Sequence, residues 1–392
     1  MSASTESRPC RRCKTTTTLT VRKDPLCETC YEAHILQRVA KALSKPYKEV
    51  KEKIGSGKAK YLLGLSFGHS STAVVQILDK NLQGLHERNL RVAYEVHVVH
   101  VDTDLSSPAV SSPLGSPAKQ LVDKYTHQFP NLQFGCVPLT AALKLDTIDW
   151  SVLPALQTEL EPAQQLSSML EALPSVSSRV DVLRLLVRHV LLSLALQNKS
   201  HAMLLGCTTT ALAELTLAET AKGRGFAVPW QVQDGPVPIT RFPRRGDGEA
   251  SQRIDKPEKT MLPVYYLLRD VFKREAITYT GLVQPPIRHL IQAAAPSTSA
   301  IVSHKELSIE DVMAKYFEEV EESYPSVVAN VVRTSGKLAR LNDGEACALC
   351  GMALDEKGDA RWKGEIGEDQ NDSKRKETAG RICYGCQRSI YG

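Results

Sequence analysis

The sequence predicts a doubly wound α/β domain with a parallel sheet, flanked at each end by a small four-cysteine metal module. Short apolar runs alternate with amphipathic stretches through the middle of the chain, a pattern typical of parallel strands joined by helices. Two of these runs end in turns rich in Gly, Ser and Thr, which in such folds lie at the carboxyl edge of the sheet. Eight of the ten cysteines lie in four Cys-x-x-Cys pairs, two near each end.

Composition sets the broad class of the protein. The 392 residues are 42% apolar, enough for a large core, and contain no run of 18 apolar residues, so we expect neither a membrane span nor a membrane partner. The first fourteen residues lack the apolar core of a secretory signal, which favours an intracellular chain. The net charge of +5 permits an acidic partner such as RNA without requiring one.

The paired cysteines predict two zinc modules, at residues 1–35 and 341–392. In an intracellular chain such pairs indicate metal ligation before a disulfide, and two pairs complete a tetrahedral thiolate site; redox-active pairs are the alternative. The first module is poor in apolar residues, so the metal would replace a core. The polar stretch 363–380 is expected to be a disordered insertion. The predicted ligands are Cys10, Cys13, Cys27, Cys30, Cys347, Cys350, Cys383 and Cys386.

A basic helix over 31–53 is predicted to link the first module to the rest, and we assign 36–59 as a linking segment. Apolar residues recur on one side of this helix, at Ile35, Leu36, Val39 and Leu43. The other side is basic and is either a solvated face or a surface that follows RNA phosphates. It carries Arg38, Lys41, Lys45, Lys48, Lys51 and Lys53.

The α/β domain is assigned to residues 60–340. β-branched and apolar runs predict its strands at 60–65, 90–102, 132–137 and 201–205. Helical periodicity predicts helices from Ser71, at 118–129, at 177–198 (the longest), at 209–221, at 262–277 and at 309–324. The last of these is acidic and is expected to face solvent or a partner. Ser-, Pro- or Gly-rich connections are expected at 105–117, 223–260 and 291–303.

The turn after the first strand, Ser66 to Ser71, predicts an anion site. The free N–H groups at a helix N-terminus and the helix dipole both favour a phosphate at such a turn. The candidate nucleotide-binding residues are Ser66, Gly68, Ser70 and Ser71. The simpler alternative is that the serines only cap the helix. A second turn of this kind, 206–210, follows the strand at 201–205 and would face the same crevice.

Basic residues near the domain edges are candidate RNA contacts. The connection 223–260 is the most basic loop of the chain, and basic loops beside a nucleotide crevice commonly hold RNA backbones. A solvated loop is the alternative. The candidate RNA-binding residues are Lys58, Lys60, Arg241, Arg244 and Arg245.

These motifs resemble the PP-loop ATP pyrophosphatases, and in particular their two-zinc-finger tRNA 2-thiolation enzymes. The turn SFGHSS resembles the family signature SGGxDS, and the order of finger, PP-loop domain and finger matches over nearly the whole chain. The resemblance implies a PP-loop α/β fold with zinc in both fingers. It also implies a cytoplasmic role in 2-thiolation of the wobble uridine of lysine, glutamine and glutamate tRNAs.

The chain departs from that family where the chemistry would occur. Phe67 replaces a Gly that lets pyrophosphate approach the backbone, and Ser70 replaces an Asp, so ATP and Mg²⁺ binding by this chain is doubtful. The turn at 206–211 lacks the family's acids. The family's cysteines before the long central helix are replaced by 175–179, without a thiol, so we expect no iron–sulfur cluster. Cys136 and Cys207 are unpaired and are interpreted as small buried hydrophobes.

Three functional hypotheses follow. The first is a non-catalytic subunit that shapes a heterodimer and holds tRNA, while a catalytic PP-loop paralogue transfers sulfur from a thiocarboxylated ubiquitin-related modifier, as the resemblance implies. The second is a nucleotide-dependent tRNA sulfurtransferase active in its own right, with the serines of the turn, and His69 beside them, near phosphate. The third is a zinc-finger adaptor that binds proteins rather than RNA. The double loss, at the turn and at the thiols, favours the first.

Overall fold

A computed structural model of the chain describes residues 7–55, 57–106, 115–242, 258–292, 307–340, 345–354 and 381–392. In this part of the chain the central sheet has six strands in the order β7-β6-β5-β8-β10-β9, and all but the edge strand β9 run parallel. The strands are β5 (Ala59–Gly64), β6 (Tyr94–Asp102), β7 (Gln133–Pro138), β8 (Ala202–Thr208), β9 (Gly235–Arg241) and β10 (Glu258–Leu268). The chain order reverses between β5 and β8, which confirms the doubly wound fold and places its switch point there.

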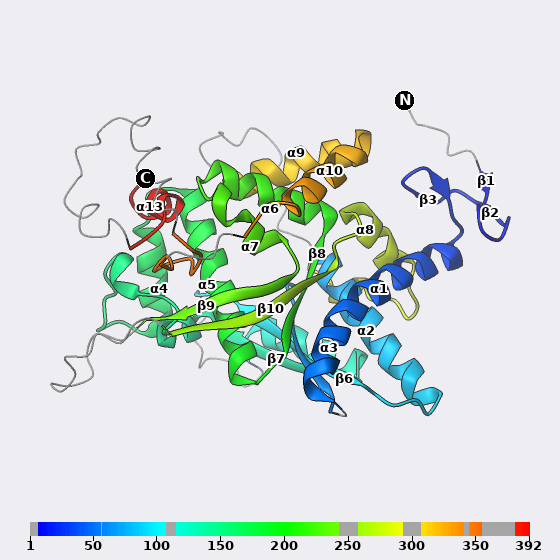
Figure 1. The fold of residues 1–392 in the computed structure, drawn as a ribbon, viewed down its shortest axis with the longest axis horizontal. Coiled ribbons are helices and arrows are strands. Elements are labelled where there is room, and N and C mark those ends of the chain that lie inside the picture. The colour runs from blue at the N-terminus through cyan, green and yellow to red at the C-terminus, as the bar shows by residue number, and fades with distance from the viewer. Residues whose placement is uncertain are drawn as a thin grey trace.

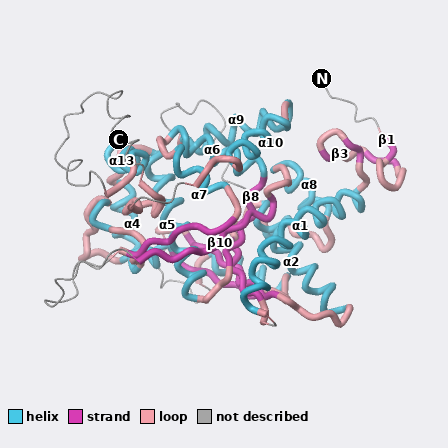
Figure 2. The backbone as a smooth tube through the Cα atoms, viewed as in Figure 1, coloured by secondary structure: helices cyan, strands magenta, loops and turns pink. Residues whose placement is uncertain are grey.

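Helices cover both faces of the sheet and form two hydrophobic cores (Figures 1 and 2). Alternate residues of β5 divide between them: Leu62 enters one core, while Tyr61 and Leu63 enter the other. The core that contains Tyr61 is closed by α1 (Glu28–Ile54), α2 (His69–Glu87), α3 (Pro117–Gln128) and α8 (Lys273–Leu282). The core that contains Leu62 is closed by α4 (Pro162–Glu171), α5 (Val176–Gln197), α6 (Thr209–Ala221), α7 (Val228–Val232), α9 (Ile309–Ser323), α10 (Pro325–Ser335) and α13 (Tyr384–Tyr391).

The four predicted strands are confirmed, but the helix predicted at 262–277 is wrong. Residues 258–268 form β10, and α8 begins only at Lys273. A parallel strand buried on both faces is a continuous apolar run, so its sequence lacks the alternation that separates strands from buried helices. β9 likewise lies inside the predicted loop 223–260, and α1, with 27 residues, is longer than α5, with 22.

Several predicted segments fall where the structure makes no description. The polar insertion at 363–380, Arg244 and Arg245, and most of the connections 105–117 and 291–303 lie outside the described residues. In the ranges that are described, each helix is too short or too polar to cross a membrane.

The C-terminal helix α13 is joined to the α/β domain by a buried cluster of charges, here called the ion cluster. Asp181 on α5 pairs with Arg224 and with Lys222, whose Nζ lies 2.7 Å from both Asp181 Oδ1 and Glu219 Oε1. Ser389 of α13 donates to Asp181 Oδ2 at 2.7 Å and accepts from Arg224 at 3.1 Å. Burial alone would raise the pKa of Asp181, but the cations around it outweigh burial and hold that pKa well below its ordinary value.

Glycines let α13 approach this cluster closely. A Cβ at Gly385 would lie 2.3 Å from Arg224 Cγ and 2.8 Å from the Lys222 carbonyl oxygen. Gly223, at φ +83°, faces the Tyr384 ring, which would contact an added Cβ at 2.4 Å. The contact between α13 and the segment 222–224 therefore requires a glycine on each side, Gly385 and Gly223.

We predict that Asp181→Asn lowers the free energy of unfolding by about 3–5 kcal/mol, because it leaves buried cations without their partner. Denaturant titration followed by circular dichroism measures the change. The matched control is Asp123→Asn, which removes a carboxylate from the exposed Lys119–Asp123 pair and is expected to cost under about 1 kcal/mol. Equal effects of the two substitutions would contradict a structural role for the ion cluster.

Candidate functional site

The predicted anion turn is present in form. It connects β5 to α2 at the switch point, and the first N–H groups of α2 face it, as helix geometry requires. The second predicted turn, 206–210, lies against the first one. A Cβ added at Gly206, near the end of β8, would lie 3.0 Å from Ser71 Cα. The two strand ends therefore lie side by side at this edge of the sheet.

Phe67 is an unusual residue at its position in this turn, because it is bulky and has a positive φ. Its φ of +59° lies in the left-handed region that favours glycine, and its side chain is almost fully buried. The ring stacks on His100, with centroids 3.9 Å apart, and lies 5.6 Å from the Tyr125 ring. The Phe67 carbonyl accepts a bond from Gln292 N–H at 3.0 Å. Packing thus offsets a backbone strain of about 1–3 kcal/mol.

The serines of the turn bond mainly to one another. Ser71 Oγ accepts from Ser66 N–H at 3.2 Å, lies 3.1 Å from Ser66 Oγ and donates to the Gly68 carbonyl at 3.2 Å. Ser66 is exposed and Ser70 is half-buried. His69 Nδ1 lies 2.7 Å from Thr280 Oγ1. The four predicted residues do lie together, and Ser71 acts as their local cap.

The two single cysteines, Cys136 and Cys207, are not activated for sulfur chemistry, because neither thiol has a lowered pKa. Burial raises the pKa of Cys207 to about 11 and that of Cys136 to about 11, so both thiols stay protonated near neutral pH. Both are half-buried rather than fully buried, a partial correction of the sequence-based interpretation. At the start of α5, Ser175 caps the helix by accepting from Ser178 N–H at 3.0 Å, and the two hydroxyls lie 2.9 Å apart.

The first four-cysteine site is confirmed as a group able to hold a metal. Cys10 and Cys13 come from the hairpin of β1 (Arg8–Pro9) and β2 (Thr16–Thr17), and a second hairpin, β3 (Thr20–Val21) with β4 (Asp24–Pro25), leads to the other pair. Cys27 is the N-cap of α1 and Cys30 lies in its first turn. All four sulfurs lie within 4.8 Å of one another, compatible with a tetrahedral zinc whose sulfurs would be about 3.8 Å apart. The N–H of Cys13, with those of Cys27 and Arg12, lowers the pKa of Cys10 to about 6, which favours a thiolate ligand.

The second site, Cys347, Cys350, Cys383 and Cys386, also has its four sulfurs within 4.8 Å of one another, but its environment differs. All four cysteines are buried and belong to the core that contains Leu62. His189 of α5 connects this site to the α/β domain: Nε2 lies 2.9 Å from the Leu349 carbonyl and Nδ1 3.0 Å from Thr147 Oγ1. No motif in the sequence points to His189 or to the ion cluster, because single polar residues from separate segments form no spacing pattern.

Three of the predicted RNA contacts, Lys58, Lys60 and Arg241, are described, and they lie away from the switch point. Lys58 and Lys60 precede and begin β5, and Lys60 pairs with Glu95 at 3.3 Å. Arg241 ends β9 opposite Glu258, the first residue of β10, and lies 4.0 Å from Asp146. Because β10 runs parallel to β8, all three residues lie at the edge of the sheet where its parallel strands begin. Arg241 and Glu258, which flank the undescribed part of the basic loop, therefore lie at the edge of the sheet opposite the anion turn.

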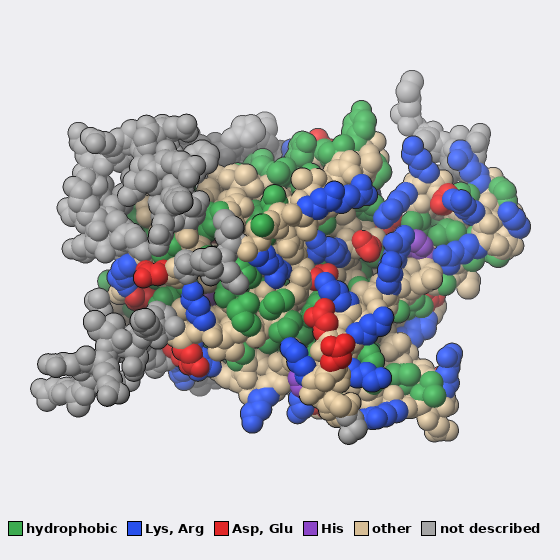
Figure 3. All heavy atoms as spheres, in the orientation of Figure 1, with side chains coloured by type: hydrophobic (Ala, Val, Ile, Leu, Met, Phe, Trp, Pro, Cys, Tyr) green, Lys and Arg blue, Asp and Glu red, His purple; other side chains and the backbone are tan. Residues whose placement is uncertain are grey.

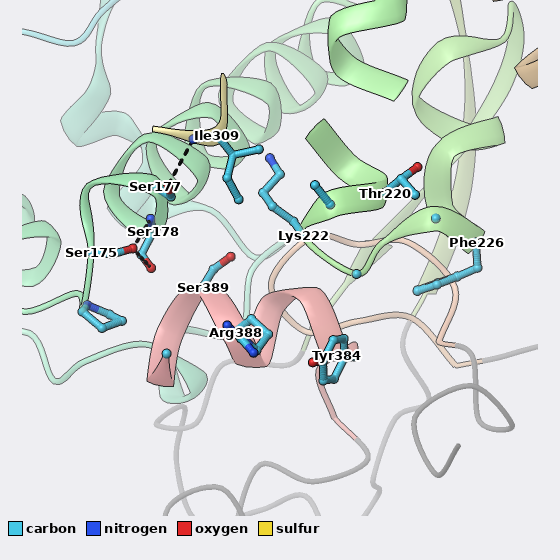
Figure 4. A pocket seen from close by; sticks show the side chains of 15 residues that line it. Ser175, Ser177, Ser178, Thr220, Lys222, Phe226, Ile309, Tyr384, Arg388 and Ser389 are labelled. Carbon is cyan, nitrogen blue, oxygen red and sulfur yellow. Dashed lines mark hydrogen bonds between the residues drawn. The ribbon is translucent and has the colours of Figure 1, made fainter. Parts of the chain in front are cut away.

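A cavity of about 840 Å³ lies where α5, α6 and α13 meet (Figure 4). Ser175, Ser177 and Thr220 line it with the aromatic rings of Phe226 and Tyr384. Lys222 also borders it, but the ammonium is already paired with three carboxylates. No spacing pattern in the sequence predicted this cavity, because its walls come from four separate segments.

We predict that a Cys→Ser substitution in either four-cysteine site removes about one of two bound zinc ions, with effects on stability that differ between the two sites. Cys383→Ser opens a buried site and is expected to lower the melting temperature of the whole protein, whereas Cys10→Ser loosens only the exposed N-terminal module. Metal analysis and thermal melts measure both effects, and Cys136→Ser is the control that keeps both metals. Wild-type protein purified without zinc would refute the assignment.

Comparison with known proteins identifies the family. The family model for cytoplasmic tRNA 2-thiolation protein 2 matches residues 308–388. Curated proteins of that name are similar over most of the chain: the one from Pyrenophora tritici-repentis is 32% identical, over 97% of this chain and 94% of its own. That from Sclerotinia sclerotiorum is 36% identical, over 82% and 80%.

The fold has a counterpart among solved structures. The U34-tRNA thiolase NcsA from Methanococcus maripaludis, solved with its [4Fe-4S] cluster, aligns with a TM-score of 0.52 at 11% identity, over 93% of this chain and 99% of that one. At this identity the similarity concerns the fold alone, which is that of a PP-loop protein. The curated relatives lead to one conclusion: the chain belongs to the cytoplasmic tRNA 2-thiolation protein 2 family.

Proposed function

We propose that this chain is a non-catalytic subunit of cytoplasmic tRNA 2-thiolation. It pairs with a catalytic PP-loop paralogue and holds the tRNA, while sulfur reaches the wobble uridine from a thiocarboxylated ubiquitin-related modifier. The names of the curated relatives support the pathway, and the described geometry supports the division of labour.

The conformation of Phe67 carries this proposal. A phosphate-binding turn brings pyrophosphate against bare backbone, which requires glycine where the chain enters the left-handed region. Here the left-handed conformation is kept, but a phenyl ring anchored on His100 and Tyr125 occupies that position. Ser70 supplies no carboxylate to help place Mg²⁺. The turn thus keeps its shape as a structural connection without its nucleotide chemistry.

Sulfur chemistry is assigned to the partner on similar grounds. The two single cysteines have pKa values of about 11, and Ser175 and Ser178 cap α5 instead of supplying thiolates. We therefore propose that this chain holds two zinc ions and no iron–sulfur cluster, unlike the archaeal thiolase named above.

A basic surface on the N-terminal module and α1 supports tRNA binding. Exposed cations follow each other along this part of the molecule (Figure 3), and phosphate contacts of this kind need only charge and spacing. We propose this surface, with Lys58 and Lys60 at the foot of β5, as the main RNA contact. Its exposed members include Arg12, Lys14, Lys23, Lys41, Lys45, Lys48, Lys51 and Lys53.

The nucleotide part is tested by measuring ATP–Mg²⁺ binding and hydrolysis with the isolated chain. We expect neither at millimolar ATP, because the turn lacks both the bare backbone and the carboxylate. The catalytic paralogue is the positive control. Hydrolysis by this chain that is abolished by Ser66→Ala would instead support the second hypothesis, an enzyme active in its own right.

The RNA part is tested by tRNA binding at several salt concentrations. Lys41→Glu with Lys48→Glu on α1 is expected to weaken binding at least tenfold in low salt and to flatten its salt dependence, because phosphate contacts are lost. Lys124→Glu with Lys315→Glu, equally exposed but on α3 and α9, is the matched control. If wild-type protein fails to bind tRNA even in low salt, the adaptor hypothesis is the better one.

A further inference from the structure

A second cavity, here called the α2 cavity, lies between α2, the turn that joins α3 to β7, and the segment that follows α8. Its volume of about 550 Å³ is within the range of roughly 300–1,000 Å³ that is typical of small-ligand sites. Two polar side chains that line it, Gln76 and Asp79, are only 5% and 8% exposed. Both belong to α2 and are three residues apart, so they lie on the same side of that helix.

Each of these two side chains is held in place through one of its polar atoms and leaves another one free. The Tyr279 hydroxyl of α8 donates to Gln76 Oε1. Asn131 donates twice to Asp79 Oδ1, from its N–H at 2.9 Å and from Nδ2 at 3.1 Å. Among the described residues, nothing bonds to the NH₂ group of Gln76 or to Asp79 Oδ2. Both atoms remain accessible from the cavity that the two residues line.

The carboxylate of Asp79 also lacks a cationic partner in the part of the chain that the structure describes. Lys80 borders the same cavity, but its ammonium lies 2.5 Å from Glu32 of α1 and is paired there. Burial raises the pKa of Asp79, although the two bonds from Asn131 oppose that rise. A buried carboxylate in this state is stabilised most by a ligand that brings N–H donors to its free oxygen.

The free atoms of the two side chains define the ligand that fits. It must offer N–H donors to Asp79 and, beside them, an acceptor to Gln76, all along one edge. A trans peptide unit points its N–H and its C=O in opposite directions, and a guanidinium has no acceptor. Guanine carries N1–H and N2–H beside the O6 acceptor, so it supplies two donors to the carboxylate oxygen and an acceptor to the amide. The other three bases present one donor or none beside each acceptor on that edge.

The other walls of the cavity suit a flat ring. Apolar side chains cover the faces of bases that proteins hold outside a helical stack. The apolar residues that line the α2 cavity are Phe129, Pro130, Pro285 and Ile287. The ion pair of Lys80 with Glu32 connects this region to α1, which carries the surface that we propose for tRNA.

We propose that the α2 cavity is a binding site for guanine, in which Asp79 accepts from the N1–H and N2–H groups and Gln76 donates to O6. Resting on the proposed function, we assign this guanine to an unpaired nucleotide of the bound tRNA. The chain then reads one base in addition to holding phosphates, because contacts to a base edge carry sequence information and contacts to phosphates do not.

The test measures binding of nucleoside monophosphates to the full-length chain by calorimetry, so that all probes share one phosphate and differ in the base. GMP is expected to bind at least tenfold more tightly than AMP, UMP or CMP, with IMP between them because it lacks the N2 amino group. Asp79→Asn keeps an acceptor for Asn131 but replaces the free oxygen by a donor, and should weaken GMP binding at least tenfold. Asp123→Asn, the same change at an exposed position of α3, is the matched control and should stay within twofold of wild type. Unchanged melting temperatures show that both variants are folded.

The outcomes separate this inference from the proposed function. GMP that binds no more tightly than AMP, or equally well to the Asp79→Asn variant, overturns the guanine site, and the comparison of GMP with IMP on the wild type needs no variant. If Asp79→Asn weakens both GMP and tRNA binding, the guanine comes from tRNA. If it weakens GMP binding alone, the ligand is a free guanine nucleotide and the assignment to tRNA is wrong. Failure of the wild-type chain to bind tRNA contradicts the proposed function and leaves the GMP result standing.

Discussion

The arrangement of the helices on one face of the sheet depends on the ion cluster, a group of buried charged side chains that are paired with one another. Asp181, Glu219, Lys222 and Arg224 are each less than a tenth exposed, so any of them left alone would cost several kcal/mol. Their partners come from α5, from the end of α6 and the turn after it, and from Ser389 of α13. Glu310 at the start of α9 completes the set. A cluster satisfied only when these segments meet fixes their register, and thereby places the C-terminal metal module and the hairpin of α9 and α10.

The other decisive region is the switch point, where we propose that the turn keeps its shape without binding nucleotide. The strand ends, the left-handed turn and the helix N-terminus are all present, yet the groups at the turn bond among themselves. Ser71 closes the turn, Thr208 caps α6, Ser175 caps α5, and the ring of Phe67 fills the interior beneath the turn. The backbone geometry of this region is therefore maintained by local caps and packing.

Features of the fold and site that arise from local sequence patterns could be predicted, and features that arise from tertiary packing could not. The Cys-x-x-Cys pairs, the strand β5 and its turn, and the apolar side of α1 are local patterns, and the structure confirms them. β10 was mistaken for a helix because a strand buried on both faces shows no alternation, and β9 was hidden in a basic, Pro-rich stretch. The ion cluster and the cavity beside α13 join residues about 200 positions apart, such as Asp181 and Ser389. Such features arise only from tertiary packing.

The central claim is that this chain supports thiolation without contributing catalytic groups of its own. It is tested most directly by reconstituting tRNA 2-thiolation with the paralogue, ATP, tRNA and the sulfur donor, and comparing wild type with Ser66→Ala combined with Ser70→Ala in this chain. The account predicts that both preparations thiolate the wobble uridine at the same rate, and that omitting this chain abolishes the reaction. A large loss of rate with the serine variant, at unchanged complex formation, would contradict it.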